Sequence, residues 1–171
     1  MGTTYSDTVT NLVANPPVPN SVSVQGGRVR TVKSTIALGT GDIDDDDIIV
    51  MARVPSNAVI QSIRLFNDDL DAHTTPTLVA DVGLYKPDGT VADRDCYASL
   101  ITTLQSANTA GVELMFEARN INEVANKVWQ DGDAVLTTDP GGLLDIAITI
   151  ETVAATAAAG DVTMIVEYTV D

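Results

Sequence analysis

Hydrophobic and polar residues alternate with a period of two through most of the chain after residue 30. Alternation of this kind indicates β-strands that bury one face and expose the other. Turn-forming residues separate the runs, and the Lys86–Gly89 segment is typical of a hairpin. The pattern predicts eight strands, at residues 31–38, 48–54, 58–67, 78–85, 90–93, 112–118, 144–150 and 162–170.

The alternation also predicts which side chains share a face within each strand. In the second strand it assigns Ile48, Val50, Ala52 and Val54 to one face, opposite Met51 and Arg53. In the last two strands it predicts buried rows at Leu144, Ile146, Ile148 and Ile150, and at Val162, Met164, Val166, Tyr168 and Val170.

Two stretches depart from the period of two and favour helices. After Asp95, a candidate N-cap, the spacing of Tyr97, Leu100, Ile101 and Leu104 predicts a helix over 97–106. Asn120 followed by Glu123 matches a capping box and predicts a second helix over 121–130, ending near Gly132. Both are expected to be short and amphipathic.

The first 33 residues differ in composition from the rest. They contain Pro16, Pro17 and Pro19 and few apolar residues, so they favour an extended arm rather than a packed element. The alternative is a terminus without function. We therefore expect an extended N-terminal arm at 1–33 and an all-β sandwich at 34–171.

Charge restricts the classes of partner. The chain has 9 Lys and Arg against 24 Asp and Glu, a formal net charge of −15, which excludes an electrostatic nucleic-acid or anionic-membrane binder. Residues 1–33 carry Arg28, Arg30 and Lys33 against Asp7, a net charge of +2, which leaves −17 for 34–171. No apolar run approaches the length of a spanning helix, so no membrane association is expected.

Candidate catalytic and metal-binding residues are few. Asp42, Asp44 and Asp46 match early positions of an EF-hand loop, but Asp47 stands where that motif has Gly and Arg53 where it has Glu. A solvated acidic turn is the favoured interpretation. His73 is the single histidine, and Cys96 lies between acidic residues that would raise its pKa. We expect no enzymatic activity, no metal and no cofactor.

Three segments together resemble jelly-roll decoration, or cement, proteins of tailed bacteriophage heads. They are Val54–Ile60, Ala80–Tyr85 with its Pro-Asp-Gly-Thr turn, and the closing Gly160–Val170 segment. The resemblance implies a jelly-roll β-sandwich of about eight antiparallel strands, with a homotrimer as the usual assembly. It also implies a structural virion protein, made in the host cytoplasm, that binds the outer surface of the major capsid protein lattice and stabilises the head.

The arm supplies the candidate contact residues for the capsid or for a neighbouring subunit. Its valines offer apolar anchors, its prolines reduce the entropy cost of ordering, and its basic residues suit ion pairs between subunits. The candidates are Val13, Pro16, Pro17, Val18, Val22, Val24, Arg28, Arg30 and Lys33.

Two other functional classes remain open at the level of sequence. The first is a carbohydrate-binding module or a receptor-binding fibre head, because jelly rolls also serve as lectins. With only seven aromatic residues, the chain offers few side chains on which a sugar ring could stack. The second is a small hydrolase with a pair of carboxylates, whose separation in space the sequence does not reveal.

Overall fold

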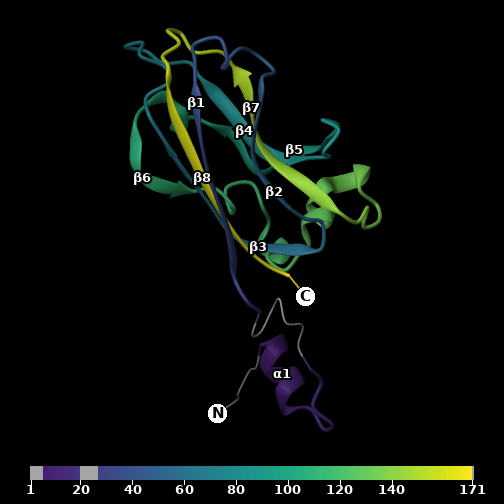
Figure 1. The fold of residues 1–171 in the computed structure, drawn as a ribbon. Helices are drawn as coiled ribbons and strands as arrows, with labels where there is room; N and C mark the ends of the chain where they lie inside the picture. Colours follow the sequence, from purple (N-terminus) through teal and green to yellow (C-terminus); the bar gives the residue numbers. More distant parts are fainter. Residues whose placement is uncertain (1–5, 20–26, 171) are drawn as a thin grey trace.

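Eight antiparallel strands form two four-stranded sheets that pack face to face (Figure 1). The computed structural model describes residues 6–19 and 27–170. No helix within these ranges is long and apolar enough to cross a membrane. The strands are β1 (Arg30–Leu38), β2 (Ile48–Pro55), β3 (Ala58–Asn67), β4 (Val79–Tyr85), β5 (Val91–Ile101), β6 (Asn108–Glu113), β7 (Leu143–Thr152) and β8 (Gly160–Val170).

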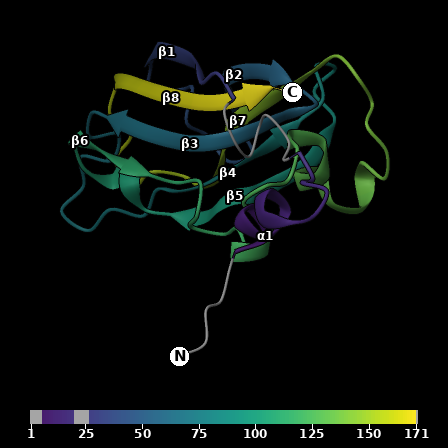
Figure 2. The same cartoon turned by 90° about the horizontal axis from the view of Figure 1, so that it is seen from below.

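The order of the strands is that of a jelly roll. One sheet has the order β1-β8-β3-β6 and the other β2-β7-β4-β5, so the first strand pairs with the last, the second with the seventh, and so on inwards. Seen from below, the two sheets form separate layers, with β1 and β2 at one side and β5 and β6 at the other (Figure 2). The predicted all-β sandwich is confirmed.

The core lies between the two sheets and follows the predicted alternation. Strands β7 and β8 bury the expected rows, with Val170 only partly buried. The β4–β5 turn is the predicted hairpin, in which Lys86 donates to the Thr90 carbonyl and Gly89 adopts φ 85°. The central members of the core are Ile60, Ile63, Leu65, Val82, Leu84, Ile146, Ile148, Val162, Met164 and Val166, each 0% exposed.

The predicted helix over 97–106 is wrong, because the first half of this segment, 97–101, belongs to β5. Val82 pairs with Ala98 and Leu84 with Asp93, so a step of two residues in β4 faces a step of five in β5. The extra residues of this bulge interrupt the period of two in β5, so its apolar residues take a spacing that resembles that of a helix. A single 3-10 turn, η1 (Thr103–Gln105), follows the strand.

The connection between β6 and β7 also departs from the prediction. The strand predicted at 112–118 ends at Glu113, and Leu114 and Met115 turn into the core. Asn120 and Glu123 do form a capping box, but they begin a single 3-10 turn, η2 (Ile121–Glu123). A 3-10 segment, η3 (Val128–Val135), replaces the rest of the expected helix.

The predicted arm is not extended throughout. A short helix, α1 (Asp7–Val13), begins after Ser6, and its first turn is closed by the hydrogen bond from Thr10 N to Ser6 O. Ser and Asp at the start of a helix are favourable N-terminal residues, a signal outweighed in the sequence by the prolines that follow. The chain is extended again at Ala14, before the cis Asn15–Pro16 bond. Strand β1 begins at Arg30, inside the range expected for the arm.

Candidate interaction surface

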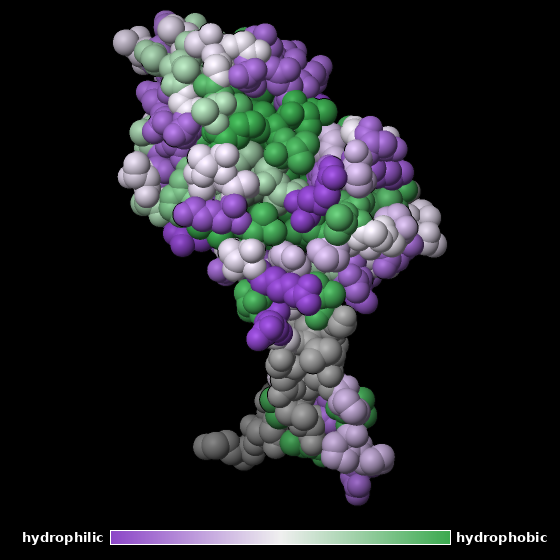
Figure 3. Space-filling model, viewed as in Figure 1, coloured by the Kyte–Doolittle hydropathy of each residue, from purple (hydrophilic) through white to green (hydrophobic). Residues whose placement is uncertain are grey.

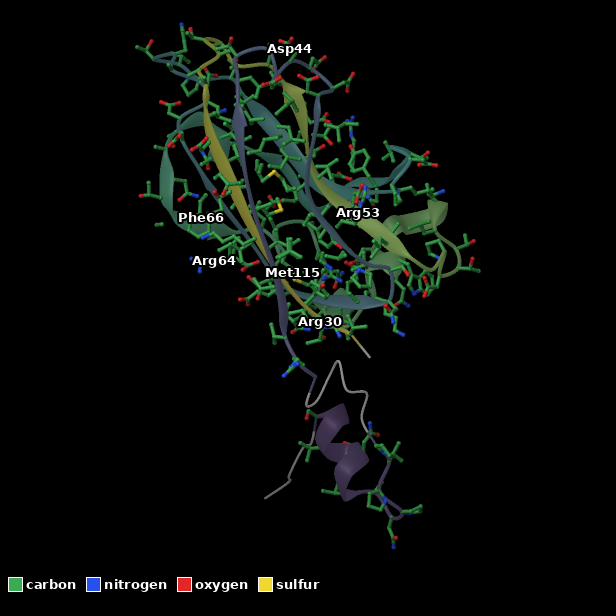
Figure 4. All side chains as sticks on the ribbon, in the orientation of Figure 1. Arg30, Asp44, Arg53, Arg64, Phe66 and Met115 are labelled. Carbon is green, nitrogen blue, oxygen red and sulfur yellow. The ribbon has the colours of Figure 1, made fainter. Side chains whose placement is uncertain are left out.

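The two ends of the sandwich differ in charge. Strand directions place the turns 39–47, 68–78, 102–107 and 153–159 at one end, which we call the distal end, and the start of β1 at the other, the basal end. The distal turns contain eight aspartates and no lysine or arginine. Figure 4 shows Asp44 and Arg30 at these opposite ends. The distal turns are therefore purely acidic, whereas the basal end carries both acidic and basic side chains.

The acidic turn at 39–47 directs two of its carboxylates to its own backbone. Asp42 Oδ2 accepts from Gly39 N at 2.7 Å, and Asp47 Oδ2 accepts from Asp44 N at 2.8 Å. Asp46 adopts φ 65°, a left-handed conformation that Asp tolerates in turns. Across the described residues, no group of three or more His, Cys, Asp or Glu side chains is arranged to hold a metal ion.

Asp71 is a buried carboxylate that joins two distal turns. Its oxygens accept from the backbone N–H groups of Thr77 and Leu78 at 2.7 and 3.1 Å, and of Ala155 and Thr156 at 3.0 and 2.9 Å. Burial raises its pKa, but these four donors outweigh that effect and hold the pKa well below the ordinary value of an aspartate. The cluster of Asp71 and its neighbours is thus a structural clamp.

A buried ionic cluster closes the basal end. Arg119 NH2 donates to Asp131 Oδ1 at 2.8 Å, and Tyr97 Oη donates to Asp131 Oδ2 at 3.2 Å. Burial raises the pKa of Asp131 to about 6, against the opposite effect of Arg119. Beside this cluster, a cavity of about 310 Å³ is lined by acidic side chains that include Asp93, Asp95 and Glu123.

The thiol of Cys96 lies beside the same cluster on β5. Burial raises its pKa well above the ordinary value, and the nearby carboxylates of Asp93 and Asp131 add to the increase. The sequence predicted this direction from the acidic neighbours alone. At neutral pH the group is therefore a protonated, weakly nucleophilic thiol.

A pair of carboxyl groups lies under Arg94 on the outer face of the second sheet. Arg94 contacts Glu151 at 2.7 Å and Asp81 at 3.7 Å, and Asp81 also accepts from Leu100 N at 2.7 Å. Burial and the nearby Asp81 raise the pKa of Glu151, whereas Arg94 lowers it. Arg94 and the backbone N–H of Leu100 therefore already interact with these two carboxyl groups. The pair links β4 to β7 across the outer face of the sheet.

The structure divides the predicted contact residues of the arm into two groups. Val13, Pro16, Pro17 and Val18 are exposed on or just after α1, which lies beyond the basal end of the sandwich (Figure 1). Arg28 is exposed just before β1, and Arg30 and Lys33 are exposed in its basal half; none of the three forms a salt bridge with another described residue. Val22 and Val24 lie outside the described residues.

An apolar area along β1 and β2 was missed by the sequence pattern. Met51 is an extra residue in β2, because Val50 pairs with Ala147 and Ala52 with Ile146, so the strand changes face there. Ile48 and Val50, expected on the face of Ala52 and Val54, point outward instead and are 45% and 52% exposed. Figure 3 shows apolar surface over the distal part of β2.

Comparison with known proteins identifies the fold. No protein-family model matches the chain, and no curated protein sequence matches it. A chain in the structure described as "Capsid of Ralstonia phage GP4" superposes with a TM-score of 0.64 at 22% identity, over 91% of this chain and 90% of that chain. A chain in "Cyanophage Pam1 capsid asymmetric unit" superposes with a TM-score of 0.56 at 23% identity, over 85% and 86%.

Proposed function

We propose that this chain is a structural protein of a bacteriophage virion and that it decorates the outer surface of the major capsid protein lattice. The observation that carries the proposal is the likeness to chains of two phage capsid structures, which extends over most of each chain rather than over one motif. The described side chains agree with a structural role, because their buried charges hold turns and strands together.

The charge distribution supports a defined orientation on the particle. The basal end carries the arm and the exposed Arg28, Arg30 and Lys33, whereas the distal turns carry eight aspartates. A basic arm favours docking on an acidic protein surface, and an acidic outer end keeps particles apart by like-charge repulsion. We therefore infer that the basal end faces the capsid and the distal end faces the solvent.

The arm is the part of the chain best suited to reach across a capsid. Val13 and Val18 expose 60% and 49% of their surface, and Val29 exposes 54%, so each has apolar area available for burial. Bound in this way, the sandwich would clamp neighbouring capsid subunits without a metal, a cofactor or a catalytic step. The assembly that we propose on the capsid is a homotrimer.

The test is reconstitution with heads assembled from the major capsid protein of the same virus in the absence of this chain. We expect the purified chain to sediment with the heads, to raise their melting temperature and to appear on their outer surface by electron cryomicroscopy. Absence of binding, or a position within the shell itself, would contradict the proposal. Binding to glycan arrays without binding to heads would favour a lectin-like role instead.

A further inference from the structure

Two opposite sides of the sandwich carry exposed apolar side chains next to the edge strands of the sheets. At the first, which we call the β1/β2 edge, Ile36, Ile48 and Val50 are 38%, 45% and 52% exposed along a groove of about 320 Å³. At the second, the β5 edge, Leu100 and Phe116 are 62% and 48% exposed. Figure 2 shows that the strands of the two edges lie on opposite sides of the sandwich.

The backbone builds the β5 edge in a specific way. Ser99 N donates to Glu117 Oε2 at 2.7 Å and Ala118 N donates to Tyr97 O at 3.1 Å, so the segment after β6 runs beside β5. Leu100 adopts φ 52°, a left-handed conformation that is uncommon for leucine. Strain of this kind persists where the surrounding contacts fix it, and here it holds a large apolar side chain in solvent.

The two edges are also complementary in charge. Arg28, Arg30 and Lys33 are exposed beside β1 and form no salt bridge with a described residue. The basal half of β5 carries Asp93 and Asp95, beside the acidic cavity described above. A basic edge and an acidic edge on opposite sides of one molecule favour contact between copies of that molecule.

Strand register places the complementary groups at the same level. The Ser34 hydroxyl donates to the carbonyl of Met51, so Lys33 of β1 lies at about the same height along the strands as Ala52 of β2. From Ala52, the pairing passes through Ile146 and Leu84 to Asp93. The basic residues of one edge thus lie opposite the acidic residues of the other.

The apolar groups of the two edges also lie at a common level, nearer the distal end. Ile48 pairs with Thr149, and Thr149 pairs with Asp81. The Asp81 carboxylate in turn accepts from Leu100 N. Each edge therefore runs from charged to apolar in the same direction along the sandwich.

We propose that the β1/β2 edge of one copy docks against the β5 edge of a second copy. The contact pairs Lys33 and its basic neighbours with Asp93 and Asp95, and it packs Ile48 and Val50 against Leu100 and Phe116. Because the two surfaces differ, the contact is heterologous. Repeating it gives a ring where the rotation between successive copies closes, and an open row of copies where it does not. The inference concerns the chain alone and does not depend on the proposed capsid partner.

Charge reversal tests the contact in solution, in the full-length chain without heads. We expect analytical ultracentrifugation at micromolar concentration to show an oligomer. Lys33→Glu and Asp95→Lys, each placed on an exposed residue, should raise the dissociation constant at least about tenfold. The double variant K33E/D95K should recover the oligomer, because the charges at positions 33 and 95 are then opposite again.

Controls separate this contact from general effects of charge. Arg64→Glu changes the net charge as Lys33→Glu does but lies on the interior strand β3, and it should leave the oligomer unchanged. Val50→Ser, which removes apolar area without adding charge, should weaken association. A monomeric wild-type chain, single variants that assemble normally, or a double variant no better than the singles would each overturn the proposal.

Discussion

Arg119 and Asp131 form an ion pair of 2.8 Å in which both side chains are almost completely buried, 2% and 3% exposed. Arg119 also lies over the ring of Tyr97, 5.7 Å from its centroid, and the Tyr97 hydroxyl donates to Asp131. The cluster thereby fastens the long β6–β7 connection to β5 at the basal end. Removal of one member of such a pair leaves an uncompensated buried charge.

Asp131 should make stability depend on pH in a defined direction. Its pKa is raised to about 6 in the folded chain, against about 3.9 when unfolded, so the folded state holds its proton more tightly. The corresponding stability is present below pH 4 and is lost as the pH rises through 6, by up to about 3 kcal/mol. Urea unfolding of the wild type and of Asp131→Asn at intervals from pH 4 to 7 measures it.

The wild type and Asp131→Asn should differ in how their stability depends on pH, because only the wild type has a titrating group at position 131. The amide that Asp131→Asn introduces cannot ionise, so the wild type should gain stability relative to the variant as the pH falls from 7 to 4. A difference that stays constant over this range would show that Asp131 titrates near its ordinary pKa in the folded chain.

Asp71 should matter more for stability than the exposed acids around it. Asp71→Asn replaces one acceptor oxygen by a donor facing backbone N–H groups, and we expect a loss of about 3 kcal/mol. Asp69 accepts a single hydrogen bond, from Asp71 N, at an exposed position, and the oxygen that Asp69→Asn retains can still accept it, so this variant is the matched control. Because the pKa of Asp71 is lowered, the stability that it contributes is present at neutral pH and is lost in acid.

Hydrogen exchange distinguishes this clamp from a general effect on the fold. In Asp71→Asn, the amides of Ala155 and Thr156 should exchange faster than those of the β7 and β8 ladder. Equal acceleration at all amides would mean that Asp71 acts on global stability alone.

Gly83 should not accept a side chain, because the bulge of β5 passes directly over it. A Cβ atom at this position would lie 2.2 Å from the carbonyl carbon of Arg94, which is backbone and cannot move aside. We expect Gly83→Ala to cost more than about 3 kcal/mol or to prevent folding. Gly41→Ala, with nothing within 4 Å of the added carbon, should change the thermal midpoint by little.

Deletion of residues 1–27 should separate folding from docking. The sandwich begins at Arg30, so the truncated chain should keep the thermal midpoint of the full chain within about 2 °C. Its cosedimentation with heads that lack the chain should fall, because the exposed valines of the arm are lost. Undiminished binding would assign the docking to the sandwich alone.

The sequence predicted the sandwich because most buried positions obey a simple period. Ile146 and Ile148, for example, alternate with residues of the outer face and lie in a regular stretch of β7. The errors fall where a bulge shifts that period. Met51 in β2 turns Ile48 and Val50 outward, and the bulge of β5 gives Tyr97 and Ile101 the spacing of a helix.

The candidate surface was less accessible to sequence reasoning than the fold. Charge alone identifies the basic residues of the arm, but the sequence pattern places Asp93 at the end of a short strand and Asp95 at a helix start. Their position opposite Lys33 depends on register across both sheets, which residue patterns do not encode. The partners of Asp71 are backbone amides of two turns, one of which lies 85 residues further along the chain, and residue spacing does not indicate such partners.

The pairing of β1 with β8 brings the start and the end of the sandwich to one place. Arg30 lies opposite Tyr168, so a domain fused after the last strand would emerge beside the arm and compete for the same space. The distal turn that contains Asp44 and Asp45 lies at the other end of the strands, and it supplies none of the backbone donors given above for Asp71. A peptide cargo inserted there would be displayed away from the arm, with the Asp71 clamp left intact.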